Sequence, residues 1–220
     1  MKIQGFLDHL LKSAQGSGNA GDKGSPQGGL GGMLNADFGK GALTGGALGL
    51  LLGKNKTTRK LATYGGLAAI GVMAYKAYGE YQQQQGGAAA YAPPQTVDRL
   101  PPPQVELHSQ AILRALVAAA KADGHIDARE RQVIEGEFSR VNQDSELQQW
   151  LHAELEKPLD PAEVAGAAST PEIASEMYLA SLMAADEQNF MERAYLDELA
   201  RQLKLDDALK LKLEQQIRQA

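Results

Sequence analysis

The sequence predicts an all-α protein whose hydrophobic core lies in its C-terminal half. Apolar residues recur at helical spacing throughout residues 106–220, and no stretch shows sustained two-residue alternation. Of the 24 glycines, 21 fall within the first 87 residues. Because each glycine costs a packed helix backbone entropy, we expect the core to form mainly from residues 106–220.

The first 35 residues are predicted to be appendages of this core. Residues 1–15 place Ile3, Phe6, Leu7, Leu10 and Leu11 at helical spacing, which predicts a short amphipathic helix. Such a helix fits either a local structural role or contact with a membrane surface, and the sequence leaves both open. Residues 16–35 are rich in Gly, Ser, Asn and Gln, as is typical of a flexible linker.

Residues 36–80 are predicted to be a membrane-associated segment. Four glycines recur every four residues, at Gly41, Gly45, Gly49 and Gly53. In a helix they form one ridge without side chains, against which a second helix can pack closely in lipid. The alternative is a glycine-rich hinge or a buried soluble hairpin, but the intervening leucines favour membrane packing.

The topology of this segment is left open by the sequence. Thirteen residues from Gly41 to Gly53 reach only about 20 Å as a helix, whereas residues 61–79 reach about 28 Å and could just span the membrane. A single span would follow the four basic residues within 54–60, which predicts an N-terminus inside and a helical domain outside. A hairpin of the two apolar runs would leave both ends on one side.

Residues 81–105 are rich in Gln, Ala and Pro, which predicts a second linker before the acidic helical domain of residues 106–220. The pairs Asp160-Pro161 and Thr170-Pro171 are typical helix starts. Apolar residues at helical spacing then indicate successive helices, with faces that include Ile112, Leu116, Ile134, Phe138, Leu147, Leu151, Ile173, Met177, Leu196, Leu199, Leu209 and Leu213.

Charge and composition exclude several classes of function. Residues 106–220 carry twelve Lys/Arg and twenty-two Asp/Glu, and this excess of acidic residues disfavours nucleic acid as a partner. The chain has no cysteine, which rules out disulfides and thiol catalysis. No nucleophile–base pair, nucleotide loop or histidine metal motif is present, so we expect a protein that is not an enzyme.

Two acidic turns stand out in the helical half. Asp123-Gly124 is typical of a helix end, while Asp127 and Glu130 form a capping box for the next helix. A second helix–acidic turn–helix unit follows 62 residues later, with Asp186, Glu187 and the cap Asn189. This internal repeat predicts a pseudo-symmetric bundle.

These turns carry a resemblance to known families. The run Ala122-Asp123-Gly124-His125-Ile126-Asp127 with Glu130 resembles the hallmark turn of TerB-like, tellurite-resistance type domains. Together with the glycine-rich segment, residues 187–196 (EQNFMERAYL) resemble the YebE-like bacterial inner-membrane proteins. The resemblance implies an all-α TerB-like bundle, a bacterial inner-membrane location and acidic turns associated with divalent metal. Glu187 departs from the hallmark because it stands where glycine is expected.

We therefore expect a membrane-anchored interaction or scaffold protein, with an association with envelope stress, whose partners are membrane lipid and a second protein or another copy of the chain. The alternative is a divalent-metal sensor or buffer that holds Ca²⁺ or Mg²⁺ through carboxylate oxygens. Its candidate ligands are Asp123, Asp127, Glu130, Asp186 and Glu187. Capping explains Asp127 and Glu130 equally well, so the sequence alone does not separate these two functions.

Overall fold

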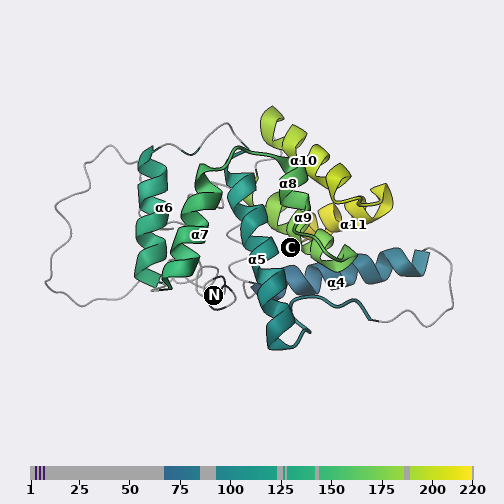
Figure 1. Ribbon diagram of the computed structural model, residues 1–220. Helices are drawn as coiled ribbons and strands as arrows, with labels where there is room; N and C mark the ends of the chain where they lie inside the picture. The colour runs from purple at the N-terminus through teal and green to yellow at the C-terminus, as the bar shows by residue number, and fades with distance from the viewer. Residues whose placement is uncertain are drawn as a thin grey trace, which may run out of the picture.

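The computed structural model of this chain describes residues 3, 5, 7, 67–84, 93–122, 126, 128–141, 144–185 and 189–219 (Figure 1). The secondary structure within these residues is helical, without strands, as the sequence predicts. The helices are α4 (Leu67–Gln84), α5 (Pro102–Ala120), α6 (Ala128–Val141), α7 (Ser145–Glu156), α8 (Pro161–Ala165), α9 (Pro171–Ala184), α10 (Phe190–Gln202) and α11 (Asp207–Gln219). Among the described helices, none has both the length and the apolar character required to cross a membrane.

Helix α9 is the centre of the bundle. Residues 173–184 are all buried, and α9 packs against α5, α4, α11 and α10. A helix that is apolar on nearly every side is stable only when other helices surround it. Each large apolar side chain buried here, such as Met177 or Leu179, contributes roughly 1.5–3 kcal/mol to folding.

Helix α4 is part of the same bundle. Leu67, Ile70, Ala74 and Ala77 lie on its buried face, against α9 and α11. The other face is exposed to solvent and includes Lys76. The described part of the predicted 61–79 span is therefore an amphipathic helix that packs on protein, because its apolar residues follow one helical face.

The predicted linker between residues 81 and 105 also differs from the structure. Helix α4 continues to Gln84, and Thr96 and Val97 are buried against the bundle. The proline run starts helix α5 at Pro102, because proline fits the first turn of a helix, where its missing N–H has no partner to lose. The bundle thus includes residues 67–84 and 93–105 as well as the predicted domain.

At Gly71, α4 and the segment of residues 93–100 approach each other closely. A Cβ atom at this position would lie 2.4 Å from Asp98 Oδ1 and 2.9 Å from the Asp98 backbone nitrogen. Glycine is therefore needed for packing at Gly71. The neighbouring Arg99 guanidinium lies 3.8 Å from the centre of the Tyr75 ring, which adds a cation–π contact between the segment and α4.

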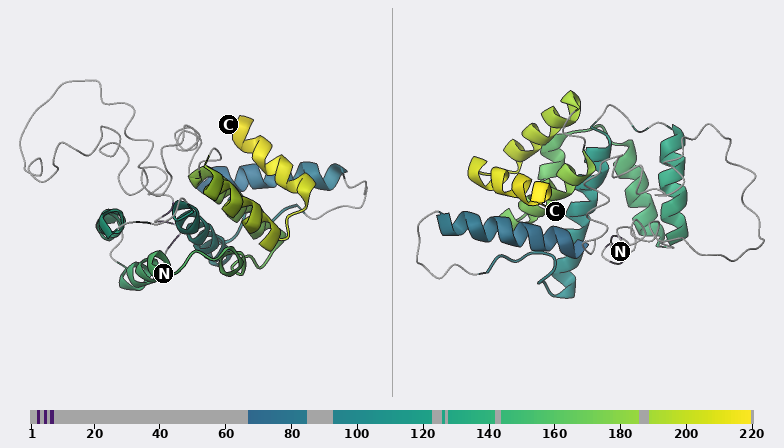
Figure 2. Two further views of the ribbon diagram at one scale, coloured as in Figure 1. Left: turned by 90° about the horizontal axis from the view of Figure 1, so that it is seen from above. Right: turned by 180° about the vertical axis from the view of Figure 1, so that it is seen from behind.

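Side chains cap the helices where the sequence predicts that they begin. Asp160 accepts a hydrogen bond from Ala162 N, Thr170 from Ile173 N, and Asn189 from Met191 N. These bonds satisfy backbone donors that have no partner within the helix. The pair α6–α7 extends to one side of the other helices, with α7 packed on α5 (Figures 1 and 2).

Candidate functional site

The structure leaves most of the predicted site residues undescribed. Asp123, Asp127, Asp186 and Glu187 lie outside the described residues, as do the four glycines that recur every four residues between Gly41 and Gly53. Glu130 belongs to α6, although its side chain is also outside the described part. Ala122 and Ala185, which directly precede the two acidic turns, are described.

Helices α5 and α9, which precede the two acidic turns, run parallel. His108 of α5 contacts Glu176 of α9, and seven residues further along α5 the carbonyl of Ala115 accepts a hydrogen bond from Ser181. The contacts advance in the same direction along both chains, so the C-terminal ends of α5 and α9 lie at the same end of the bundle. Both acidic turns start from this end, directly after the buried residues Ala122 and Ala185.

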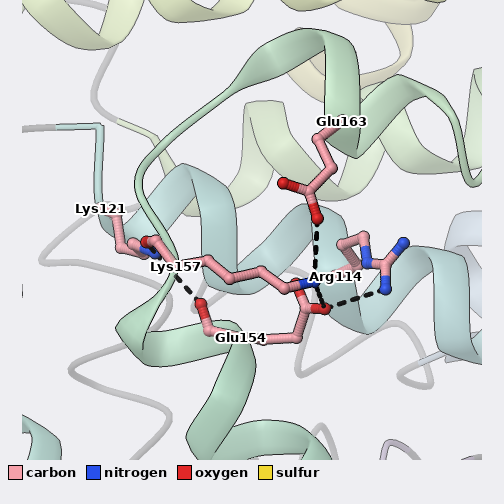
Figure 3. A network of polar contacts seen from close by, with 5 residues as sticks. All are labelled: Arg114, Lys121, Glu154, Lys157 and Glu163. Atoms are coloured by element: carbon pink, nitrogen blue, oxygen red, sulfur yellow. Dashed lines mark hydrogen bonds and ion pairs between the residues drawn. The ribbon is translucent and has the colours of Figure 1, made fainter.

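A polar network lies beside the C-terminal end of α5 (Figure 3). Glu154 of α7 accepts hydrogen bonds from Arg114 of α5 at 2.9 Å and from Lys157 at 2.8 Å. Lys157 also donates to Glu163 of α8 at 2.8 Å. Glu154 is 8% exposed, so its two cationic partners compensate most of the cost of burying its charge. The network joins three helices.

Lys121 completes this network from the end of α5. Its ammonium donates hydrogen bonds to the backbone carbonyls of Glu154 and Lys157, at the C-terminus of α7. Burial lowers the pKa of Lys121, while the neighbouring Glu154 carboxylate raises it in part. A cation at a helix C-terminus stabilises carbonyls that have no partner within the helix. Lys121 thus fixes the last turn of α5 immediately before the first acidic turn.

The cavity at this network is too small for a substrate. Its volume is about 20 Å³, and Arg114, Lys121, Glu154 and Glu163 are among the residues that line it. A cavity of that size holds about one water molecule. The carboxylates of Glu154 and Glu163 already accept hydrogen bonds from cations, and the hydrogen bonds from Lys157 lower the pKa of Glu163. This arrangement stabilises the junction of α5, α7 and α8.

A second polar cluster lies inside the bundle. Glu176 of α9 is fully buried, with Oε2 2.5 Å from His108 Nδ1 and Oε1 2.5 Å from the backbone nitrogen of Val97, which donates to it. Burial raises the pKa of Glu176, and the hydrogen bond with His108 opposes that rise. The cluster attaches residues 93–100 to α5 and α9. The cluster is closed to solvent, because Glu176 has no exposed surface and His108 is only 5% exposed.

The His108–Glu176 cluster is not predicted from the sequence. One signal was present: Glu176 is the single charged residue within the apolar run 173–184. A carboxylate on a helix that is buried on all sides requires a partner, because an unpaired buried charge is strongly unfavourable. The partner could not be inferred, since it comes from a helix 68 residues earlier in the chain.

A hollow of about 240 Å³ lies between α6 and α7. His152 lines it, with Nδ1 2.7 Å from Glu135 and Nε2 3.6 Å from Glu156. The hydrogen bond with Glu135 raises the pKa of His152, and the negative charge of Glu156 raises it further. These contacts join the two helices at the surface. Among the described side chains of the molecule, no group of three or more His, Asp or Glu could hold a metal ion.

The first turn of α10 exposes two large apolar side chains. Phe190 is 81% exposed and Met191 is 55% exposed, directly after the cap Asn189. Further along the same helix, Tyr195, Leu196 and Leu199 are buried in the bundle. Adjacent exposed Phe and Met residues are typical of an interaction surface, where these residue types are enriched.

The described residues therefore define the class as an all-helical bundle protein. The chain belongs to the family described as "Protein of unknown function (DUF533)", whose model matches residues 37–217. It is 33% identical over 115 residues to a Yersinia enterocolitica protein described as "Uncharacterized protein in ampR 5'region". That match covers 52% of this chain and 83% of the relative. No solved structure matches the chain.

Proposed function

We propose that this chain is a membrane-associated interaction protein without enzymatic activity, whose helical bundle binds a protein partner through the start of α10. The exposure of Phe190 and Met191 is the observation that carries the proposal. An exposed aromatic ring beside a flexible thioether provides an apolar anchor for a pocket on a partner. The polar clusters at Glu154 and Glu176 support a non-catalytic role, because their hydrogen bonds join helices to one another.

Membrane association is proposed for the glycine-rich segment of residues 36–60. The support is the four-residue spacing of Gly41, Gly45, Gly49 and Gly53 among leucines, followed by four basic residues. The resemblance to YebE-like proteins supports a bacterial inner-membrane location, and a role in envelope stress is part of the same proposal. Washing isolated membranes with carbonate tests the location: we expect the protein to remain in the pellet, and its release would contradict membrane insertion.

The partner surface is tested by photo-crosslinking in intact cells. A photoreactive phenylalanine at position 190 should give a discrete adduct with a second protein, whereas the same residue at position 211 should not. Leu211 is a matched control because it is also apolar and is 56% exposed, but lies on α11. The double substitution Phe190→Ser and Met191→Ser should remove the partner from a pull-down. Equal recovery with this variant and with Leu211→Ser would contradict the assignment.

A second function, divalent-metal sensing by the acidic turns, is supported by the parallel arrangement of α5 and α9. Since both helices end at the same end of the bundle, the turns containing Asp123 and Asp186 start from neighbouring elements. If the carboxylates of Asp123, Asp127, Asp186 and Glu187 lie close together, they repel one another, and a bound cation relieves that repulsion. The response of the melting temperature to Ca²⁺ or Mg²⁺ tests this proposal.

A further inference from the structure

Residues near the N-terminus are buried in the helical bundle. Ile3 is 1% exposed and Leu7 is fully buried, and both belong to the hydrophobic core that includes α4, α5 and α9. They are helical and four residues apart, so both lie on the same face, while Gly5 between them is exposed. The N-terminal amphipathic residues are therefore docked on protein.

A polar contact fixes this docked position. The backbone nitrogen of Ile3 donates a hydrogen bond to Glu106 Oε1 at 2.6 Å. Glu106 lies in the first turns of α5, more than one hundred residues away in the chain. A carboxylate is a strong acceptor for the N–H groups at the start of a helix, which have no partner within that helix. Apolar burial and this hydrogen bond together specify where the N-terminal residues bind.

The next described residues after Leu7 belong to the same bundle. Leu67 is 3% exposed and starts α4, which packs against α9 and α11. Residues 7 and 67, which flank the segment of residues 8–66, are therefore both held in one bundle. This intervening segment contains the glycine repeat proposed to associate with the membrane.

We infer that the N-terminal residues and helices α4–α11 lie on the same side of the membrane, because both ends of the segment 8–66 are attached to one bundle. A segment with both ends on one side enters the membrane as a hairpin or an interfacial loop and does not cross it once. A single net crossing would separate Leu7 from the apolar core that buries it, which is unfavourable because it exposes that apolar surface. The docking stands on the structure, and the topology rests on the proposed membrane association.

Spin-label distances in the purified full-length chain test the docking. The chain has no native cysteine, so Gly5→Cys and Leu107→Cys introduce two unique label sites. Both positions are exposed, and a Cβ at Gly5 meets no atom within 4 Å. We expect a short and narrow distance distribution, since Leu107 follows the Glu106 that binds Ile3. A broad, long distribution would overturn the docking.

The substitution Leu7→Asp should convert that narrow distribution to a broad one, because it places a charge in the apolar site. Circular dichroism of the variant controls for the fold of the bundle. If the bundle unfolds in this variant, the distribution from the otherwise unaltered chain still decides the question. This measurement does not depend on whether the protein binds membranes.

The topology is tested with the single-cysteine variants Gly5→Cys and Leu211→Cys in sealed membrane vesicles of both orientations. A maleimide that does not cross membranes should label both variants in the same orientation and neither variant in the other. Labelling in opposite orientations would overturn the inference. Loss of the protein to the carbonate supernatant would instead contradict the proposed membrane association, and the spin-label result would still decide the docking.

Discussion

At the scale of single residues, Gly71 allows the segment of residues 93–100 to pack closely against α4, because glycine has a hydrogen where alanine has a methyl group. We expect Gly71→Ala to lower the free energy of unfolding by about 1–3 kcal/mol, as overpacking does, because its Cβ would overlap Asp98. Urea denaturation followed by circular dichroism measures this change.

The matched control is Gly79→Ala in the same helix. A Cβ at Gly79 meets no atom within 4 Å, so alanine should raise stability by about 0.5–1 kcal/mol through the entropy of the unfolded chain. If both substitutions were neutral, the close approach at Gly71 would have no energetic role.

Glu176 predicts a dependence of stability on pH. Burial raises its pKa in the folded chain above the usual value of 4.5, so the folded state holds this proton more tightly than the unfolded state. The protonated form of Glu176 therefore contributes to the stability of the fold. This contribution is fully present below pH 4.5 and is lost as the pH rises through the raised folded pKa. Glu176→Gln removes this titration and keeps an oxygen that can accept from Val97 N.

We therefore expect the variant to gain stability relative to the original chain as the pH rises above about 4.5, until the raised pKa is passed. Thermal denaturation of both proteins from pH 4 to pH 8 measures the difference. A difference that is constant across this range would show that the pKa of Glu176 is the same in the folded and unfolded chains.

At the scale of helices, Glu154 tests whether the network beside α5 stabilises the bundle. Glu154→Gln should cost about 1–3 kcal/mol, because the hydrogen bonds from Arg114 and Lys157 to the buried Glu154 would lose the charge that strengthens them. Glu156→Gln is the matched control on the same helix: Glu156 is 53% exposed and pairs with Arg131 at the surface. Such a pair contributes about 0–1 kcal/mol.

Chemical denaturation of the two variants separates these cases. Equal losses for Glu154→Gln and Glu156→Gln would mean that the buried network is no stronger than a surface ion pair. A larger loss for Glu154→Gln would establish that this carboxylate stabilises the contact between α5 and α7.

The helices were largely predictable because their signals are local. The caps Asp160, Thr170 and Asn189 each act within three residues, so the sequence placed these helix starts correctly. The sequence predicted a linker up to residue 105, whereas α5 starts at Pro102. A proline run fits both a spacer and a helix start, and only packing distinguishes them.

Contacts between distant residues could not be predicted in the same way. The apolar run of α4 fits a membrane helix and a buried face equally well, and its partners α9 and α11 begin 104 and 140 residues after the start of α4. The same holds for Ile3 with Glu106 and for His108 with Glu176. Residue spacing indicates that a face is apolar, but it does not indicate what covers that face.

At the scale of the whole molecule, the bundle determines which form of the protein a metal experiment must use. A fragment of residues 106–220 would lack α4 and residues 93–105, which cover part of α9 and α11 and supply the Val97 N–H to Glu176. Such a fragment would expose apolar surface and leave a buried carboxylate with one partner fewer. The full-length chain is therefore the appropriate protein for the test.

In the full-length chain, Ca²⁺ or Mg²⁺ should raise the melting temperature if the acidic turns bind a divalent cation, because binding to the folded state stabilises it by mass action. Asp123→Asn should abolish the rise, since it removes one carboxylate from the proposed ligands. Asp127→Asn should reduce the response to metal with little loss of stability in its absence, because asparagine still caps a helix.

Sodium chloride at equal ionic strength is the control for screening. If it raises the melting temperature as much as the divalent cation does, the turns act only as helix caps. The interaction function proposed for Phe190 and Met191 would then stand without a metal-dependent step.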